Sequence, residues 1–139
     1  CVGNSCRSQM AEGYLKFYGE EKAQYFSAGL RRNEVHPLAI KVMAEDSIDI
    51  SWHTSQLIDV YAGQHFDYVI SVCDEISDQI PNFITSDKFF NFNVPDPAQF
   101  VGSPAATLKE FRRIREMLKT HMLKFLGSEL TEKEEVVLS

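Results

Sequence analysis

Cys1 and Arg7 are separated by five residues at the start of the sequence, with Gly3 between them. A glycine allows the backbone to turn so that successive N–H groups converge on one point. The helix predicted to begin at about Arg7 adds the partial positive charge of its N-terminus, and a guanidinium can bind two oxygens of one tetrahedral anion. We therefore predict an oxyanion-binding loop made of Val2, Gly3, Asn4, Ser5, Cys6 and Arg7.

Cys1 is the candidate nucleophile of this loop. The positive field favours the thiolate of Cys1 and so lowers the pKa of that thiol, and the thiolate is the reactive form. Ser8 can donate a hydrogen bond to the sulfur. Because a cysteine and an arginine also occur at this spacing by accident, the pattern depends on its context: Gly3 inside the loop, Ser8 after it and an amphipathic helix next.

Asp96 lies between Pro95 and Pro97. Pro97 biases Asp96 away from helical angles, and the two prolines stiffen the loop. A carboxyl held in this way over an anion can act as a general acid, protonating the oxygen that leaves when Cys1 attacks phosphorus or arsenic. The alternative is that Pro-Asp-Pro is only a turn.

Cys73 closes the most apolar stretch of the sequence, which begins at Tyr68. A cysteine in this place is more often a structural residue of the core. A second thiol near a nucleophilic one can instead resolve an adduct by forming a disulfide, so both interpretations of Cys73 remain open. Cys6 is expected to pack into the protein. No pair of the four histidines has metal-ligand spacing, and we predict no metal site.

The apolar pattern alternates between helical and strand periods. It predicts helices at residues 7–18, 37–46 and 108–127, and strands around Tyr25, at 68–73 and at 88–92. Strands alternating with helices indicate an α/β fold with a parallel sheet, in which ligands bind at the carboxyl ends of the strands. Cys1, Cys73 and Asp96 all fall at such ends. No strand leads into Cys1, so we expect the first strand upstream of the given chain.

The composition predicts one domain over residues 1–127 and an acidic C-terminal tail, mobile or weakly docked, over residues 128–139. With 14 Lys and Arg against 20 Asp and Glu, the net charge is −6, which argues against nucleic acid as a partner. No apolar run approaches the roughly 20 residues that span a bilayer, and no signal peptide is recognisable. Three cysteines are too few for a secreted disulfide framework. We expect a cytoplasmic monomer that does not bind membranes.

Several motifs occur in the order found in one family: CVGNSCRSQMAEG at residues 1–13, SAG at 27–29, VHP at 35–37, IDIS at 48–51, HTS at 53–55 and DPA at 96–98. Over roughly residues 1 to 125 the chain resembles the low-molecular-weight protein tyrosine phosphatase superfamily, and within it the arsenate reductase branch. The resemblance implies a four-stranded parallel sheet with helices on both faces. It also implies that the strand missing before Cys1 is a central member of that sheet.

The resemblance further implies a reaction. Cys1 attacks arsenate, Arg7 and the loop amides hold the oxyanion, and Asp96 assists the loss of water. Cys73 then attacks Cys1, releasing arsenite and leaving a disulfide. The alternatives are a phosphatase that hydrolyses phosphomonoesters through a phosphocysteine, and a protein that only senses oxyanions. Ala98 favours the reductase, because the phosphatases typically carry an aromatic residue just after Asp-Pro.

Two departures from this family concern the reductant and a cation. The thioredoxin-coupled members carry a third redox cysteine where this chain has Ile80, so we predict that an external thiol regenerates the enzyme: thioredoxin, glutaredoxin or a small thiol. Some members hold potassium with residues matching Asn4, Glu12, Ser27 and an Asp where this chain has Gln56. The loss of that carboxylate argues against a bound cation, and we predict no cofactor.

Overall fold

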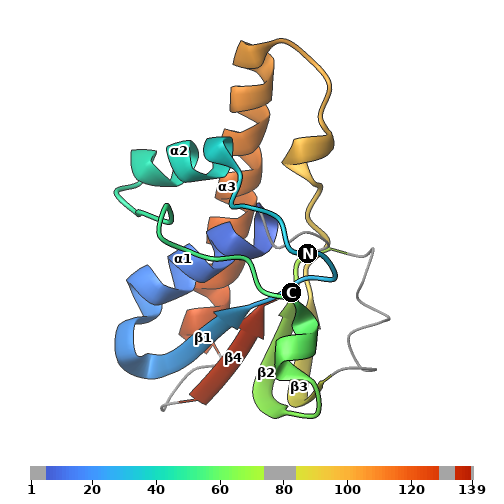
Figure 1. Ribbon diagram of the computed structural model, residues 1–139. Helices are drawn as coiled ribbons and strands as arrows, with labels where there is room; N and C mark the ends of the chain where they lie inside the picture. Colours follow the sequence, from blue (N-terminus) through green and yellow to red (C-terminus); the bar gives the residue numbers. More distant parts are fainter. Residues whose placement is uncertain (1–5, 74–83, 129–133, 139) are drawn as a thin grey trace.

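The computed structural model describes residues 6–73, 84–128 and 134–138 (Figure 1). Its helices are α1 (Arg7–Gly19), α2 (Pro37–Glu45) and α3 (Pro104–Ser128), and its strands are β1 (Ala23–Ser27), β2 (His65–Ser71), β3 (Thr85–Asn91) and β4 (Glu134–Leu138). The short 3-10 turns are η1 (Glu20–Lys22), η2 (Ile58–Tyr61) and η4 (Pro97–Gln99). The predicted helices and strands are confirmed, with boundaries that differ by a few residues.

The four strands form one sheet in the order β1-β4-β2-β3, and each neighbouring pair is parallel. Val136 lies opposite Tyr25 on one side and opposite Tyr68 on the other. Val136 and Val137 point to opposite faces of the sheet, and both are fully buried. The sheet centre is therefore covered on both faces, as a parallel sheet requires. The predicted α/β class and four-stranded parallel sheet are confirmed.

The C-terminal segment differs from its prediction. Residues 128–139 were expected to form a mobile or weakly docked tail. The structure ends α3 at Ser128 and places β4 between β1 and β2, with residues 136–138 buried. β4 thereby occupies the central position in the sheet that was expected for a strand upstream of Cys1. The strand is difficult to predict from this acid-rich sequence, because only three consecutive apolar residues mark it. Hydrogen bonding to a neighbouring strand on each side supplies the rest of its stability.

Helices α1 and α3 pack together on one face, where the ring of Tyr68 on β2 meets that of Phe125 on α3 at 5.1 Å. Turn η2 contacts the sheet through Tyr61, whose ring lies 5.6 Å from Phe26 and 6.0 Å from Phe66. Five of the six residues on the predicted apolar face of α3 are buried: Phe111, Ile114, Leu118, Met122 and Phe125. The sixth, Leu108, is half-buried and packs against the core. No helix in the described ranges has both the length and the apolarity to cross a membrane.

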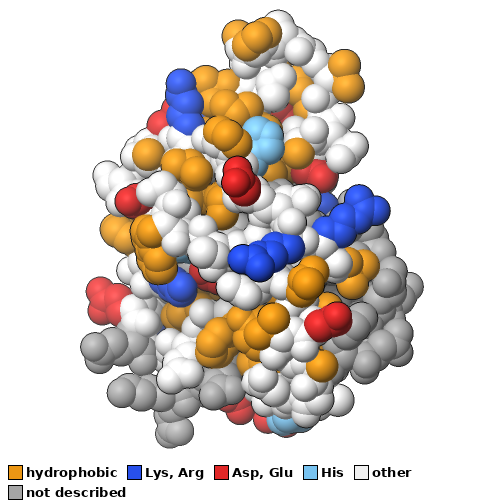
Figure 2. All heavy atoms as spheres, viewed as in Figure 1, with side chains coloured by type: hydrophobic (Ala, Val, Ile, Leu, Met, Phe, Trp, Pro, Cys, Tyr) orange, Lys and Arg blue, Asp and Glu red, His pale blue; other side chains and the backbone are white. Residues whose placement is uncertain are grey.

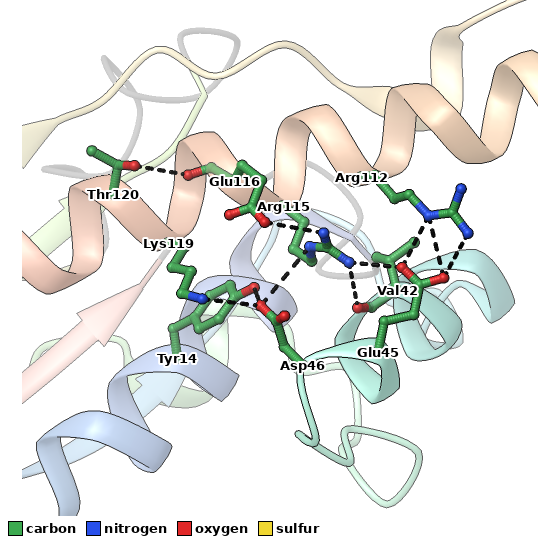
Figure 3. A network of polar contacts seen from close by, with 9 residues as sticks. All are labelled: Tyr14, Val42, Glu45, Asp46, Arg112, Arg115, Glu116, Lys119 and Thr120. Atoms are coloured by element: carbon green, nitrogen blue, oxygen red, sulfur yellow. Dashed lines mark hydrogen bonds and ion pairs between the residues drawn. The ribbon is translucent and has the colours of Figure 1, made fainter.

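Charged side chains join the helices on this face (Figure 3). Glu45, the last residue of α2, accepts hydrogen bonds of 2.8 Å from both Arg112 and Arg115 on α3. Asp46 accepts a 2.6 Å hydrogen bond from the Tyr14 hydroxyl of α1. The hydrogen bond from Arg112, with that from Arg115, lowers the pKa of Glu45 to about 2. The network therefore stays ionised down to low pH and fixes α2 against α1 and α3.

Candidate active site

Arg7 is the first residue of α1 and lies almost entirely inside the protein, with 3% of its surface exposed. One of its terminal nitrogens, Nη1, donates a 2.9 Å hydrogen bond to the carbonyl of Val94. Its other terminal nitrogen, Nη2, lies 3.6 Å from Oδ2 of Asp96. A buried guanidinium held in this way presents a fixed positive charge at the start of the helix, as the sequence predicted for an oxyanion site.

Asp96 forms the turn that its Pro-Asp-Pro motif predicted, and its carboxyl group also approaches Arg7. Its Oδ1 accepts a 3.0 Å hydrogen bond from the N–H of Ala98, which makes Asp96 the N-cap of the turn η4. Its Oδ2 faces Arg7, and the side chain keeps 22% of its surface exposed. The carboxyl group is thus fixed by the turn on one side and faces the buried guanidinium and solvent on the other.

Cys73 is fully buried two residues beyond the end of β2, which stops at Ser71 rather than at Cys73 as predicted. The Ser71 hydroxyl donates a 2.7 Å hydrogen bond to the Cys73 carbonyl. The segment after β3 continues the pairing: Phe92 N–H bonds the Ser71 carbonyl at 2.8 Å and Val94 N–H bonds the Val72 carbonyl at 3.1 Å. The same segment binds Arg7 and carries Asp96. It therefore brings Arg7, Asp96 and the end of the segment that leads to Cys73 together at the carboxyl end of β2.

The other predicted site residues divide into two groups. Ser8 and Cys6 are buried at the start of α1, and the Cys6 carbonyl accepts a 2.9 Å hydrogen bond from Met10 N–H. The packing role predicted for Cys6 agrees with its place among the core residues. The predicted nucleophile and the rest of its loop lie outside the described residues: Cys1, Val2, Gly3, Asn4 and Ser5.

A buried polar group that the sequence did not single out fixes the first turns of α1. Gln9 Oε1 lies 3.0 Å from His53 Nδ1, and Gln9 Nε2 donates to the Thr54 carbonyl at 3.1 Å. His53 Nδ1 also lies 3.2 Å from the Glu12 carboxylate. Burial lowers the pKa of His53, although Glu12 acts in the opposite direction. The sequence did contain a pattern that indicates this group, because Gln9 and Glu12 lie three positions apart and so share one side of α1, which is buried.

His36 is a second residue that sequence reasoning missed. Its Nδ1 accepts a 3.1 Å hydrogen bond from Leu38 N–H at the start of α2, and its ring lies 4.8 Å from that of Phe111. Burial lowers the pKa of His36, and the negative charge of Asp96 opposes that shift. Burial therefore favours the neutral form of the His36 imidazole. No local signal marks it, because its position depends on the packing of α2 on α3.

Three of the four residues suggested for potassium line one hollow of about 280 Å³: Glu12, Ser27 and Gln56. The Glu12 carboxylate already accepts a 3.1 Å hydrogen bond from the Lys16 ammonium. The Gln56 amide nitrogen donates to Thr54 Oγ1 at 3.0 Å. These contacts do not fit a cation site. The carboxylate of Glu12 is already paired with a positive charge, and Gln56 does not add a second carboxylate. Among the described residues, no three His, Cys, Asp or Glu side chains gather to hold a metal ion.

On the face shown in Figure 2, Lys and Arg side chains lie apart from one another among apolar and acidic groups. Nucleic-acid binding normally depends on a clustered basic surface. This face therefore offers no surface of that kind.

Comparisons with known proteins agree with this geometry. The family model described as "Low molecular weight phosphotyrosine protein phosphatase" matches residues 1–136. The chain is 40% identical to "Arsenate reductase 2" of Staphylococcus epidermidis, covering 90% of this chain and 91% of that protein. It is 35% identical to "Arsenate reductase" of Bacillus subtilis, covering 90% of each. A solved structure, "An arsenate reductase in oxidized state", has a TM-score of 0.78 at 35% identity and covers 90% of this chain and 91% of its own. Another, "An arsenate reductase in the phosphate binding state", has a TM-score of 0.73 at 34% identity, with 91% and 92% covered. The chain therefore belongs to the low molecular weight phosphotyrosine protein phosphatase family.

Proposed function

We propose that the protein is an arsenate reductase that uses Cys1 and Cys73 as its redox pair. The observation that carries the proposal is that residues 92–96 contact Arg7, carry Asp96 and pair with the two residues that precede Cys73, at the carboxyl end of β2. The relatives named as arsenate reductases, each similar over about nine-tenths of the chain, support it. The place is the expected one for a ligand in a parallel α/β sheet.

The first step forms a bond between sulfur and arsenic. Arg7 and the loop amides hold the oxyanion and keep Cys1 ionised, and the Cys1 thiolate attacks arsenic. An arsenic-bound oxygen must then leave, and Asp96 supplies its proton so that it departs as water. The turn η4 suits this role, because it fixes one oxygen of the Asp96 carboxyl while the side chain keeps 22% of its surface exposed.

The second step transfers the electron pair. The Cys73 thiolate attacks the sulfur of Cys1, a sulfur–sulfur bond forms, and the sulfur–arsenic bond breaks with both electrons staying on arsenic. Arsenic(V) thereby becomes arsenic(III), which leaves as arsenite, and the two thiols become a disulfide. Because Cys73 is fully buried beside residues 92–94, its thiol is shielded from oxidants in bulk solvent before the adduct forms.

Regeneration needs two further electrons from an external thiol. Because position 80 is isoleucine rather than cysteine, no third cysteine there can take over the disulfide, and the external thiol must attack the Cys1–Cys73 disulfide directly. A reducing compartment rich in thiols, such as the cytoplasm, supplies that reductant. No step calls for a metal or another cofactor, since thiols provide both electrons. The substrate is an oxyanion, with arsenate as the acceptor of electrons.

One pair of assays tests the proposal on the wild type and on Cys73→Ser. The first measures arsenate-dependent oxidation of a supplied thiol, and the second measures hydrolysis of a chromogenic aryl phosphate. We expect Cys73→Ser to abolish arsenate reduction while any phosphate ester hydrolysis persists, because the adduct still forms. Rapid hydrolysis by both forms without arsenite would overturn the proposal in favour of a phosphatase. Tight oxyanion binding with neither activity would leave only a sensor.

A further inference from the structure

We propose that a hollow beside the active site binds the zwitterionic, amino-acid end of a small thiol that reduces the enzyme. The inference rests on the proposed function, because it names the reductant of that reaction. The hollow has a volume of about 450 Å³, within the range of small-molecule sites. Its lining comes from two loops and from Ile40 on α2, and the loops contribute Arg32, Glu34, Val35, Ser51, His53 and Thr54.

The charges on one wall suit a ligand that carries both signs. Arg32 and Glu34 stand on either side of Asn33, and both are exposed. Among the described residues neither forms an ion pair. A guanidinium binds a carboxylate with two hydrogen bonds, and a carboxylate binds an ammonium. An α-amino acid group presents both partners at a short, fixed distance from each other.

A second part of the lining supplies neutral polar groups. Ser51 and Thr54 bring hydroxyls, which can donate to and accept from the amide groups of a peptide-like ligand. His53 is held by Gln9 and Glu12, and burial lowers its pKa, so this part adds no positive charge near pH 7. The charge recognition therefore depends on Arg32 and Glu34 alone.

The hollow is joined to the start of α1, which carries Arg7. His53, which lines the hollow, hydrogen-bonds Gln9, two residues beyond Arg7 on α1. A ligand anchored at Arg32 and Glu34 can thus extend its thiol past His53 towards the helix start that carries Arg7.

The burial of Cys73 favours a small thiol over a protein thiol. None of the surface of Cys73 is exposed, and backbone hydrogen bonds pair the two residues before it with residues 92–94. A protein cysteine has to bring its own backbone close to the sulfur it attacks, whereas a small thiol needs room only for itself. Thiolate attack on the Cys1–Cys73 disulfide releases one enzyme thiolate and gives a mixed disulfide. A second small thiol then releases the other enzyme thiol and leaves as the small disulfide, so two electrons enter the enzyme.

Binding is measured first, with S-methylglutathione, which has the zwitterionic end of a small thiol but cannot react. Calorimetric titration of the wild type is compared with Arg32→Ala, Glu34→Ala and the matched control Arg31→Ala. Arg31 is the same exposed residue type one position away and does not line the hollow. We expect at least tenfold weaker binding in the first two variants and no change in the control. No binding to the wild type, or an equal loss in Arg31→Ala, would overturn the inference.

Kinetics then separate this inference from the proposed function. With glutathione as the reductant, Arg32→Ala should raise the KM for the thiol about tenfold and leave kcat and the KM for arsenate unchanged. With 2-mercaptoethanol, which lacks the charged end, the same variant should match the wild type. Turnover with thioredoxin but not with glutathione would refute the small-thiol site and leave the reductase intact. Failure of every thiol to support arsenate reduction would refute the proposed function, while the titration still reports on the hollow.

Discussion

Replacing Asp96 by Asn removes an acidic proton from the candidate active site and keeps the shape of the side chain. The Asn oxygen can still accept the 3.0 Å hydrogen bond from Ala98 N–H, so the turn η4 is retained. The interaction with Arg7 spans 3.6 Å and its carboxyl is partly exposed, so its loss costs about 1 kcal/mol of unfolding free energy. The loss of a general acid costs about 10²- to 10⁴-fold in rate. We therefore expect kcat for arsenate reduction to fall at least 100-fold in a protein that remains folded.

Three measurements on Asp96→Asn check this reasoning: the initial rate of arsenate reduction, the denaturation midpoint, and the affinity for phosphate. Phosphate should bind at least as tightly as in the wild type, because a negative charge next to the anion has been removed. Asp87→Asn is the control, since Asp87 is exposed and, within the described ranges, bonds only the exposed His65. A fall in kcat of less than threefold, or one accompanied by an equal loss of phosphate affinity, would show that Asp96 is not the general acid.

Three further predictions concern stability and ions. Val137→Ala should lower the unfolding free energy by about 2 kcal/mol, because Val137 is fully buried at the centre of the sheet. The control Val101→Ala, at a residue 93% exposed, should change the unfolding free energy by less than about 0.5 kcal/mol. Equal losses in denaturant unfolding of the two variants would refute the central role of β4. Glu45→Gln should lower the unfolding free energy by about 1 kcal/mol at pH 7, a modest loss because the side chain is one-third exposed. Because the pKa of Glu45 is lowered from 4.5 to about 2, the difference from the wild type should persist above pH 4.5 and vanish as the pH falls towards 2. A difference that does not depend on pH would contradict the ion-pair explanation. Potassium chloride and choline chloride at equal ionic strength should give the wild type the same melting temperature and arsenate reduction rate. Gln56→Asp should introduce a potassium dependence, because it adds a second carboxylate beside Glu12. A potassium effect on the wild type would show that the hollow lined by Glu12, Ser27 and Gln56 binds a cation.

Local sequence was enough to predict most elements and part of the site. Pro37 at the start of α2 and the apolar spacing along α3 are local signals, and both helices form where those signals place them. The turn at Asp96 is local too, because its cap joins residues two positions apart. The approach of Arg7 to this turn is not local, since the Arg7–Val94 hydrogen bond joins residues 87 positions apart.

The sequence by itself determined the α/β class, and it predicted the kind of chemistry: a cysteine and arginine loop for an oxyanion, with a second cysteine and a carboxyl group at strand ends. Only the tertiary structure decided that residues 134–138 fill the centre of the sheet, that Asp96 faces Arg7, and that Arg112 and Arg115 bind Glu45. The physical reason is that strand pairing, burial and ion pairing depend on groups brought together from distant parts of the chain. Helix periods, prolines and turns, by contrast, depend on neighbours within a few residues.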